Sequence, residues 1–139
     1  MRTLLFTALL SLSVLGCSKE ENKTQHVKLS ATVPDVTIDE LSAKLANGEC
    51  QAVDANGDAT RKKLGVIPGA VLLTDSETFS TNELPKDKSK TLVFYCANTH
   101  CSASEEAAAR ALTAGYKNVK ILSEGIAGWV AAGKQTQKI

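Results

Sequence analysis

The sequence predicts an α/β domain in which helices flank a small, mostly parallel β-sheet. Residues 92–95 form a short apolar run without polar alternation, which is typical of a strand that is covered on both faces. Strand and helix patterns alternate along the chain, and this order favours parallel pairing with right-handed crossovers. The chain has 139 residues, of which 43% are hydrophobic, so one ordinary globular domain is expected.

The first half of the domain contains two predicted helical segments around one strand. Thr37 and Glu40 have the spacing of a capping box, and the helix that begins there is expected to end at Asn47 and Gly48. Residues 50–54 are predicted to form a short strand. Residues 59–64 are predicted to form one helical turn, and its basic side chains are expected on a solvated face: Arg61, Lys62 and Lys63.

The second half continues the alternation. Residues 66–73 are predicted as a turn that feeds a strand, since Pro68 and Gly69 do not fit its centre. Residues 74–89 are loop-like, with room for a turn of helix. After the strand at residues 92–95 we expect a helix over residues 102–114, a last strand over 118–122 and a final helix over 125–132.

Cys96 closes the apolar strand and stands just before a helix. Unpaired N–H groups and the helix dipole favour a thiolate at such a place and lower the thiol pKa. Successive N–H groups in a turn can also hold an anion such as a persulfide. Position alone leaves this interpretation level with that of a buried structural cysteine.

The order of the motifs is similar to that of a rhodanese domain. The resemblance covers roughly residues 33–133 and rests on four segments in the family's order: Val66-Ile67-Pro68-Gly69-Ala70, the strand, cysteine, loop and helix around Cys96, Gly115-Tyr116-Lys117-Asn118-Val119, and Gly125-Ile126-Ala127-Gly128-Trp129. It implies a three-layer sandwich with a five-stranded, mostly parallel sheet. It also implies a persulfide-forming cysteine at Cys96 and a structural hydrogen-bonding role for Asp54.

The loop after Cys96 departs from the common family pattern because it contains no arginine. Relatives use arginines there to bind thiosulfate, so we expect weak thiosulfate activity and no phosphatase activity. His100 is the only side chain of the loop that can become cationic. The residues expected to line the substrate site are Ala97, Asn98, Thr99, His100 and Ser102.

Cys101 gives the loop a second thiol. It can resolve a persulfide or sulfenate on Cys96, or form a protective disulfide with it. Cys50 is a poor partner because it begins its strand, whereas Cys96 follows the end of another. A metal site is disfavoured because two cysteines and one histidine lack a nearby fourth ligand, so no metal and no cofactor are expected.

The first seventeen residues are predicted to be a targeting segment. One basic residue precedes a Leu-rich run that ends at Gly16 and Cys17. The ending resembles a bacterial lipobox, which makes residues 1–16 a signal peptide and Cys17 a lipidated residue; a plain signal peptide or a short anchor is the alternative. Residues 17–32 are then a polar tether and residues 33–139 the rhodanese-like domain. Ser18 resembles the outer-membrane sorting pattern.

These features predict an envelope protein that is anchored to a membrane through Cys17 and faces the periplasm or the cell exterior. Sulfane-sulfur handling through Cys96, with Cys101 as resolving or disulfide partner, is the leading interpretation. A rhodanese-fold binding module without catalysis and a thiol–disulfide redox protein are the alternatives. Its expected partners are a small sulfur donor or a protein thiol. Nucleic acid is excluded by a net charge of +1 and the absence of a basic stripe.

Overall fold

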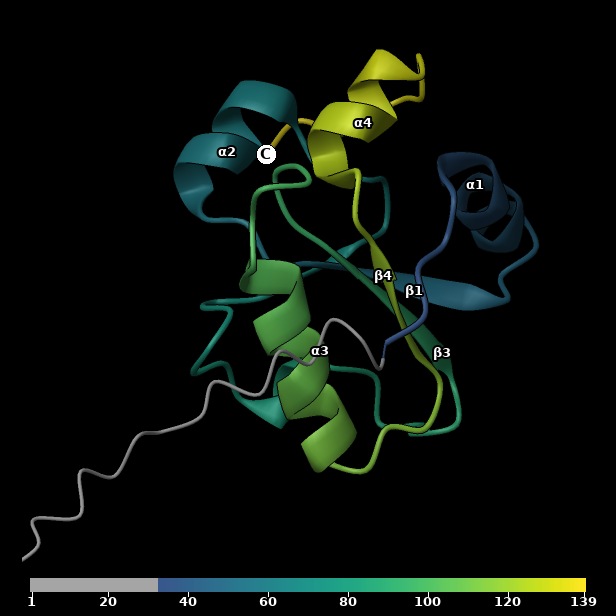
Figure 1. Cartoon of the computed structure of the whole chain (residues 1–139), viewed down its shortest axis with the longest axis vertical. Helices are drawn as coiled ribbons and strands as arrows, with labels where there is room; N and C mark the ends of the chain where they lie inside the picture. Colours follow the sequence, from purple (N-terminus) through teal and green to yellow (C-terminus); the bar gives the residue numbers. More distant parts are fainter. Residues whose placement is uncertain (1–32) are drawn as a thin grey trace, which may run out of the picture.

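A parallel sheet of four strands forms the centre of the structure, a computed structural model that describes residues 33–139 (Figure 1). The predicted signal peptide, the lipidation site Cys17 and the tether lie outside the described residues. The spatial order of the strands is β2-β1-β3-β4. Their bounds are β1 Cys50–Asp54, β2 Val71–Leu72, β3 Thr91–Tyr95 and β4 Val119–Leu122.

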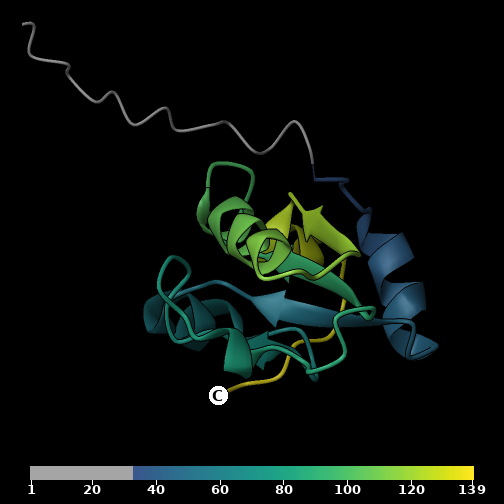
Figure 2. The same cartoon turned by 90° about the horizontal axis from the view of Figure 1, so that it is seen from below.

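The helices cover both faces of this sheet, which gives three layers. Side chains of β3 alternate between two cores: Leu92 and Phe94 face one, and Val93 and Tyr95 face the other. The first core is covered by the alanine-rich face of α3 (Ala103–Thr113), and the second by α1 (Ile38–Ala46) and α4 (Gly125–Ala131). Figures 1 and 2 show α3 and α1 on opposite sides of the sheet. The predicted α/β sandwich with flanking helices is confirmed.

One of the two hydrogen bonds of the capping box predicted at Thr37 and Glu40 is present at the start of α1 (Ile38–Ala46). The Thr37 hydroxyl oxygen accepts a hydrogen bond from the Glu40 N–H at 3.2 Å and caps α1. Leu41 is buried, with Ile38 and Leu45 packed beside it. The remaining helical segments are α2 (Asp58–Leu64) and a short 3₁₀ turn, η2 (Thr81–Glu83), in the loop before β3.

The sheet has four strands where five were predicted. A single parallel bridge between Asp35 and Ile121 stands where a fifth strand would extend the sheet beyond β4. The Val36 N–H donates to the Ile121 carbonyl at 2.9 Å, and the Ile121 N–H donates to the Pro34 carbonyl at 3.0 Å. Pro34 has no N–H to donate, and the capped helix begins directly after this segment, so pairing stops at one bridge.

Arg61 is buried, so the predicted solvated face is wrong for this residue. It is 6% exposed, and its Nε lies 3.3 Å from an Asp54 carboxylate oxygen. Its Nη2 donates to the carbonyl oxygens of Asp54 at 3.1 Å and Leu73 at 2.8 Å. Lys62 and Lys63 are exposed, as predicted. A fully buried carboxylate at the strand end requires a counter-charge, and α2 supplies it.

No helix within residues 33–139 has the length and apolar character required to cross a membrane.

Candidate active site

Cys96 lies at the carboxyl end of the sheet, between β3 and α3. Tyr95, the last residue of β3, pairs with Asp54, the last residue of β1. The chain leaves β3 at Cys96, loops past the start of α4 and returns into α3 (Figure 1). The predicted arrangement of strand, cysteine, loop and helix is therefore present, and the helix begins one residue later than predicted, at Ala103.

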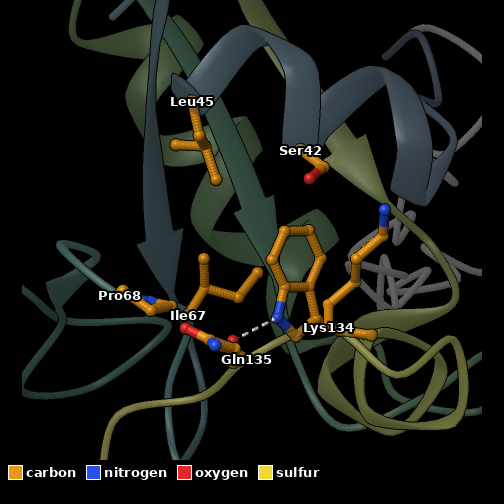
Figure 3. A pocket seen from close by; sticks show the side chains of 7 residues that line it. Ser42, Leu45, Ile67, Pro68, Lys134 and Gln135 are labelled. Atoms are coloured by element: carbon orange, nitrogen blue, oxygen red, sulfur yellow. Dashed lines mark hydrogen bonds between the residues drawn. The ribbon is translucent and has the colours of Figure 1, made fainter. Parts of the chain in front are cut away.

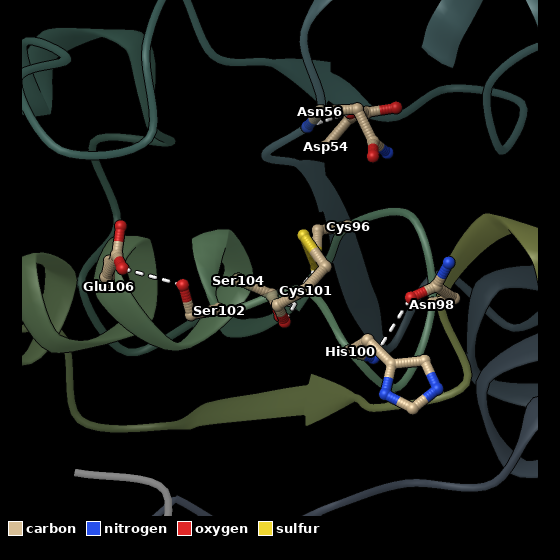
Figure 4. Close-up of a disulfide and its surroundings, with 9 residues drawn as sticks. All are labelled: Asp54, Asn56, Cys96, Asn98, His100, Cys101, Ser102, Ser104 and Glu106. Atoms are coloured by element: carbon tan, nitrogen blue, oxygen red, sulfur yellow. Dashed lines mark hydrogen bonds between the residues drawn. A yellow bond between two sulfur atoms is a disulfide. The ribbon is translucent and has the colours of Figure 1, made fainter. Parts of the chain in front are cut away.

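The structure pairs Cys96 with Cys101 in a disulfide across the loop, with 6.3 Å between the two Cα atoms (Figure 4). Asn98 shapes the turn that brings them together. Its carbonyl oxygen accepts from the Cys101 N–H at 3.1 Å, and its side-chain oxygen accepts from the His100 N–H at 3.0 Å. Cys50 pairs with Thr91 at the opposite end of β1 and β3, so it is remote from Cys96, as expected.

Two oxygen atoms lie beside the Cys96 sulfur. The Ser104 hydroxyl oxygen is 3.4 Å away, and the Cys101 carbonyl oxygen is 3.2 Å away. A disulfide sulfur has no hydrogen, so in this state only the hydroxyl can donate. After reduction the two oxygens act in opposite directions: the hydroxyl can donate to a thiolate, whereas the carbonyl can only accept from a thiol.

The start of α4 holds the beginning of the loop. The Ile126 N–H donates to the Cys96 carbonyl oxygen at 2.9 Å, and the Ala127 N–H donates to the Ala97 carbonyl oxygen at 3.0 Å. Gly125 has a φ of +62°, and a Cβ there would lie 2.6 Å from the Cys96 carbonyl oxygen. Only glycine therefore fits this contact between the helix start and the loop.

A buried polar network supports the strand ends below Cys96. The Tyr95 hydroxyl donates to an Asp54 carboxylate oxygen at 2.7 Å and accepts from the Ile67 N–H at 3.1 Å. Burial, with the Asp54 carboxylate as the second cause, raises the pKa of Tyr95 far above its ordinary value, so the phenol stays protonated. The structural role expected for Asp54 agrees with these contacts, in which Arg61 supplies the charge.

Asn56 places a hydrogen-bond donor without a partner at this edge of the sheet. Its backbone N–H donates to the Asp54 carboxylate at 2.7 Å, but its side-chain Nδ2 is buried and has no partner among the described residues. The preceding N–H, that of Ala55, donates to the Tyr95 carbonyl oxygen at 2.9 Å, which fixes this segment beside the start of the loop formed by residues 97–102, here called the reactive loop. Figure 4 shows Asn56 on the side toward which the Cys96 sulfur points.

The residues expected to line the substrate site form the outer surface of the loop. Asn98, Thr99, His100 and Ser102 are exposed and Ala97 is partly exposed. Figure 4 shows the His100 ring turned away from the disulfide. The Ser102 hydroxyl donates to the Glu106 carboxylate at 2.8 Å.

Sequence reasoning missed three residues that contact or support this site: Ser104, Asn56 and Gly125. Ser104 is the second residue of α3. Its position eight residues after Cys96 does not indicate contact with the sulfur, because that contact depends on how the loop folds. Asn56 follows the end of β1, and an asparagine there predicts a turn. It does not predict that the side-chain amide is buried without a hydrogen-bond partner among the described residues. Gly125 belongs to a recognised motif, but its contact with the backbone of another segment needs the fold.

A surface pocket of about 290 Å³ lies elsewhere, against α1, α4 and the C-terminal segment (Figure 3). Trp129 is buried in the wall of this pocket, and its indole N–H donates to the Gln135 carbonyl oxygen at 2.8 Å. No residue of the reactive loop lines this pocket. Within residues 33–139 no group of three or more His, Cys, Asp or Glu side chains is arranged to hold a metal ion.

Comparison with known proteins identifies the family. The model of the rhodanese-like domain matches residues 37–132, which is most of the chain. The chain belongs to the rhodanese-like family. The match includes the reactive loop and every described helix and strand of this rhodanese-like domain. No curated protein matches the chain.

Solved structures share the fold of this rhodanese-like domain. A protein from Bacillus halodurans aligns with a TM-score of 0.65 and 23% identity over 79% of this chain and 80% of its own. The rhodanese-like domain of an Anabaena protein gives 0.62 and 24% identity over 76% and 80%. A human single-domain sulfurtransferase gives 0.57 and 22% identity over 71% and 96%. At these identities the likeness establishes the fold alone.

Proposed function

We propose that this rhodanese-like protein handles sulfane sulfur, which it carries as a persulfide on Cys96 and releases with the help of Cys101. One observation carries the proposal: the two cysteines meet at the carboxyl end of the parallel sheet, where Cys96 follows β3 and precedes α3. This is the place where loops of α/β folds gather reactive groups.

The loading step transfers one sulfur atom to the reduced protein. The Cys96 thiolate attacks the outer sulfur of a hydropersulfide donor, so that a Cys96–sulfur bond forms and the donor's sulfur–sulfur bond breaks. The donor leaves as a thiolate, and Cys96 becomes a hydropersulfide. No electrons are exchanged with a further reagent, and the proton of the donor's outer sulfur remains on the transferred atom.

The release step uses the second cysteine. The Cys101 thiolate attacks the Cys96 sulfur, the Cys96–Cys101 disulfide forms, and the outer sulfur leaves as hydrosulfide. Two thiol equivalents from outside the protein must then reduce the disulfide before another cycle. Because the two residues are already paired in one loop, the thiol that resolves the persulfide acts intramolecularly.

The polarity of the site favours a donor of low charge. The loop between Cys96 and α3 contains no Arg or Lys to neutralise a dianion, and Glu105 and Glu106 stand in the first turn of α3. The Nδ2 of Asn56, which has no partner among residues 33–139, offers a neutral donor instead. We therefore place hydropersulfides and polysulfides ahead of thiosulfate as donors, and Asn56 as a residue that binds the transferred sulfur.

The cellular setting is part of the same proposal. The charged start, Leu-rich run and Gly16-Cys17 ending of the first seventeen residues support a lipoprotein that is anchored at Cys17. Such a protein faces the periplasm or the cell exterior, where disulfides persist. A small sulfur donor and a protein thiol acceptor would meet it there.

The second candidate is thiol–disulfide exchange without sulfur transfer, favoured by the disulfide itself. Mass spectrometry of the reduced protein after treatment with polysulfide or thiosulfate separates the candidates. A gain of one sulfur atom on the peptide with Cys96 supports the carrier. The release step of the carrier also ends in the Cys96–Cys101 disulfide, so the same treatment is applied to reduced Cys101→Ser, in which that step is blocked. Loss of two protons in the parent with no sulfur gain in Cys101→Ser supports the exchange protein, and no change in either protein supports a binding module.

The Asn56→Leu variant adds a test of the donor within the same experiment. Removing an unpaired buried donor is nearly neutral for stability, so reduced loading in a stable variant would identify a binding role. Unchanged loading would remove Asn56 from the site.

A further inference from the structure

The two sulfur atoms of the disulfide differ in their access to solvent. Cys96 is 2% exposed and belongs to the core between the sheet and α3. Cys101 is partly exposed, and its two chain neighbours, His100 and Ser102, are both exposed. A reagent in solution therefore meets Cys101 first.

We infer that an external thiol reduces this protein by attacking Cys101, and that Cys96 is the leaving sulfur. This inference rests on the proposed redox pairing of the two cysteines, but it does not require that Cys96 carries sulfane sulfur. It assigns the second cysteine as the residue that forms the covalent link with the thiol partner.

The direction of attack supports this order. Exchange proceeds through a thiolate that approaches a disulfide sulfur in line with the bond that breaks. For attack on Cys96, the nucleophile would have to enter the core that holds this residue together with Ala107 and Ala108. For attack on Cys101 it approaches over the exposed loop.

The surroundings of Cys96 also suit a leaving thiolate. The Ser104 hydroxyl oxygen lies 3.4 Å from its sulfur and can donate to the anion. The helix α3, which is 11 residues long, begins directly after the loop, so its N-terminus lies at this end of the sheet. The positive end of its dipole favours an anion there. The Cys101 carbonyl oxygen, 3.2 Å from the same sulfur, opposes the anion until the loop moves with its freed cysteine.

The chemical balance requires two external thiols. The first thiolate forms a bond to the Cys101 sulfur, the Cys96–Cys101 bond breaks, and its electron pair remains on the Cys96 thiolate. A second thiolate attacks the mixed disulfide, the partner leaves as its own disulfide, and the Cys101 thiolate is released. The protein gains two electrons and the two thiols lose them.

The test locates the first mixed disulfide. The oxidised full-length chain is exposed briefly to limiting 2-mercaptoethanol, quenched with acid and alkylated, and its peptides are sequenced by mass spectrometry. We expect the mercaptoethanol adduct on Cys101 in about tenfold or greater excess over Cys96, with the alkyl label on Cys96. Adducts chiefly on Cys96, or in equal amounts on both, would overturn the inference.

A control separates the fold from the local sequence. The same oxidised chain in guanidinium chloride should lose the preference, because burial of Cys96 is lost with the fold. A preference of equal size in the denatured chain would also overturn the inference. No sulfur donor is present, so failure to load a persulfide and failure of this order of attack are distinguishable outcomes.

Discussion

Gly125 lies against the carbonyl oxygen of Cys96, so that the backbone at the start of α4 is in direct contact with the beginning of the reactive loop. The Ile126 N–H, one residue further on, donates to the same oxygen at 2.9 Å. The backbone of Cys96 is therefore held by two elements: β3, which directly precedes it in the chain, and α4, which packs beside it in space. The position of the sulfur depends on a glycine that has no chemistry of its own.

Gly125→Ala should destabilise the domain and shift the loop. The φ of +62° costs an alanine about 1–2 kcal/mol, and the overlap with Cys96 and Ala97 adds about 1–3 kcal/mol. Gly133→Ala is the matched control, because its φ is +73° but no atom lies within 4 Å of its Cβ position. Denaturant unfolding measures both variants; equal losses would show that close approach to the loop is unimportant.

Arg61→Met should cost about 3–5 kcal/mol, because it leaves the Asp54 carboxylate buried without its counter-charge. The neighbouring Lys62 is exposed, so Lys62→Met should change the free energy of unfolding by only about 0.5 kcal/mol. Chemical denaturation at neutral pH compares the two. If both variants kept the parent stability, the buried pair would not support the strand ends.

In the reduced protein, Cys96 should react faster with an alkylating reagent than Cys50. Burial raises the pKa of the Cys50 thiol, so less thiolate is present at a given pH, whereas the Ser104 hydroxyl and the start of α3 favour the Cys96 anion. Alkylation rates against pH in variants that retain one cysteine give each pKa. A Cys96 that titrates at or above the ordinary thiol value of about 8.5 would remove the electrostatic argument.

The fold was predictable because hydrophobic pattern and turn chemistry are local. The run at residues 92–95 and the cap at Thr37 each specify their element with nearby residues, and the structure contains both. The prediction of a fifth strand was wrong, because the single bridge at Asp35, next to Pro34, does not extend into a strand. The fifth strand was expected from the family resemblance, and no hydrophobic pattern in residues 33–36 indicates a strand.

The burial of Arg61 was not predictable from its own segment. Its neighbours Lys62 and Lys63 give it the appearance of a solvated face, and only the position of the Asp54 carboxylate explains its burial. In the site, the strand-end position of Cys96 was readable from the sequence. The contacts of Ser104 and the unpaired Asn56 amide depend on segments far apart in the chain, which no local pattern encodes.

Cys17→Ser should release the protein from the membrane fraction. The proposed anchor is lipid on the Cys17 sulfur and the new N-terminus, and without that thiol neither lipidation nor the associated cleavage can occur as proposed. Ser18→Ala, at the adjacent position, should leave the partition unchanged. Fractionation with N-terminal mass analysis measures both. A Cys17→Ser protein with the parent's N-terminus and membrane association would contradict the lipoprotein proposal.

The lifetime of the Cys96 persulfide after a single loading tests the central claim most directly. Reduced parent, Cys96→Ser and Cys101→Ser proteins are treated with polysulfide, freed of excess reagent and followed by intact mass without added reductant. The account predicts that Cys96→Ser carries no persulfide at the reactive loop. It also predicts a longer persulfide lifetime in Cys101→Ser than in the parent, because the Cys101 thiol that would attack the persulfide is absent. Equal lifetimes in the parent and Cys101→Ser would contradict the resolving role of Cys101, and loading of Cys96→Ser at the loop would contradict the assignment of Cys96.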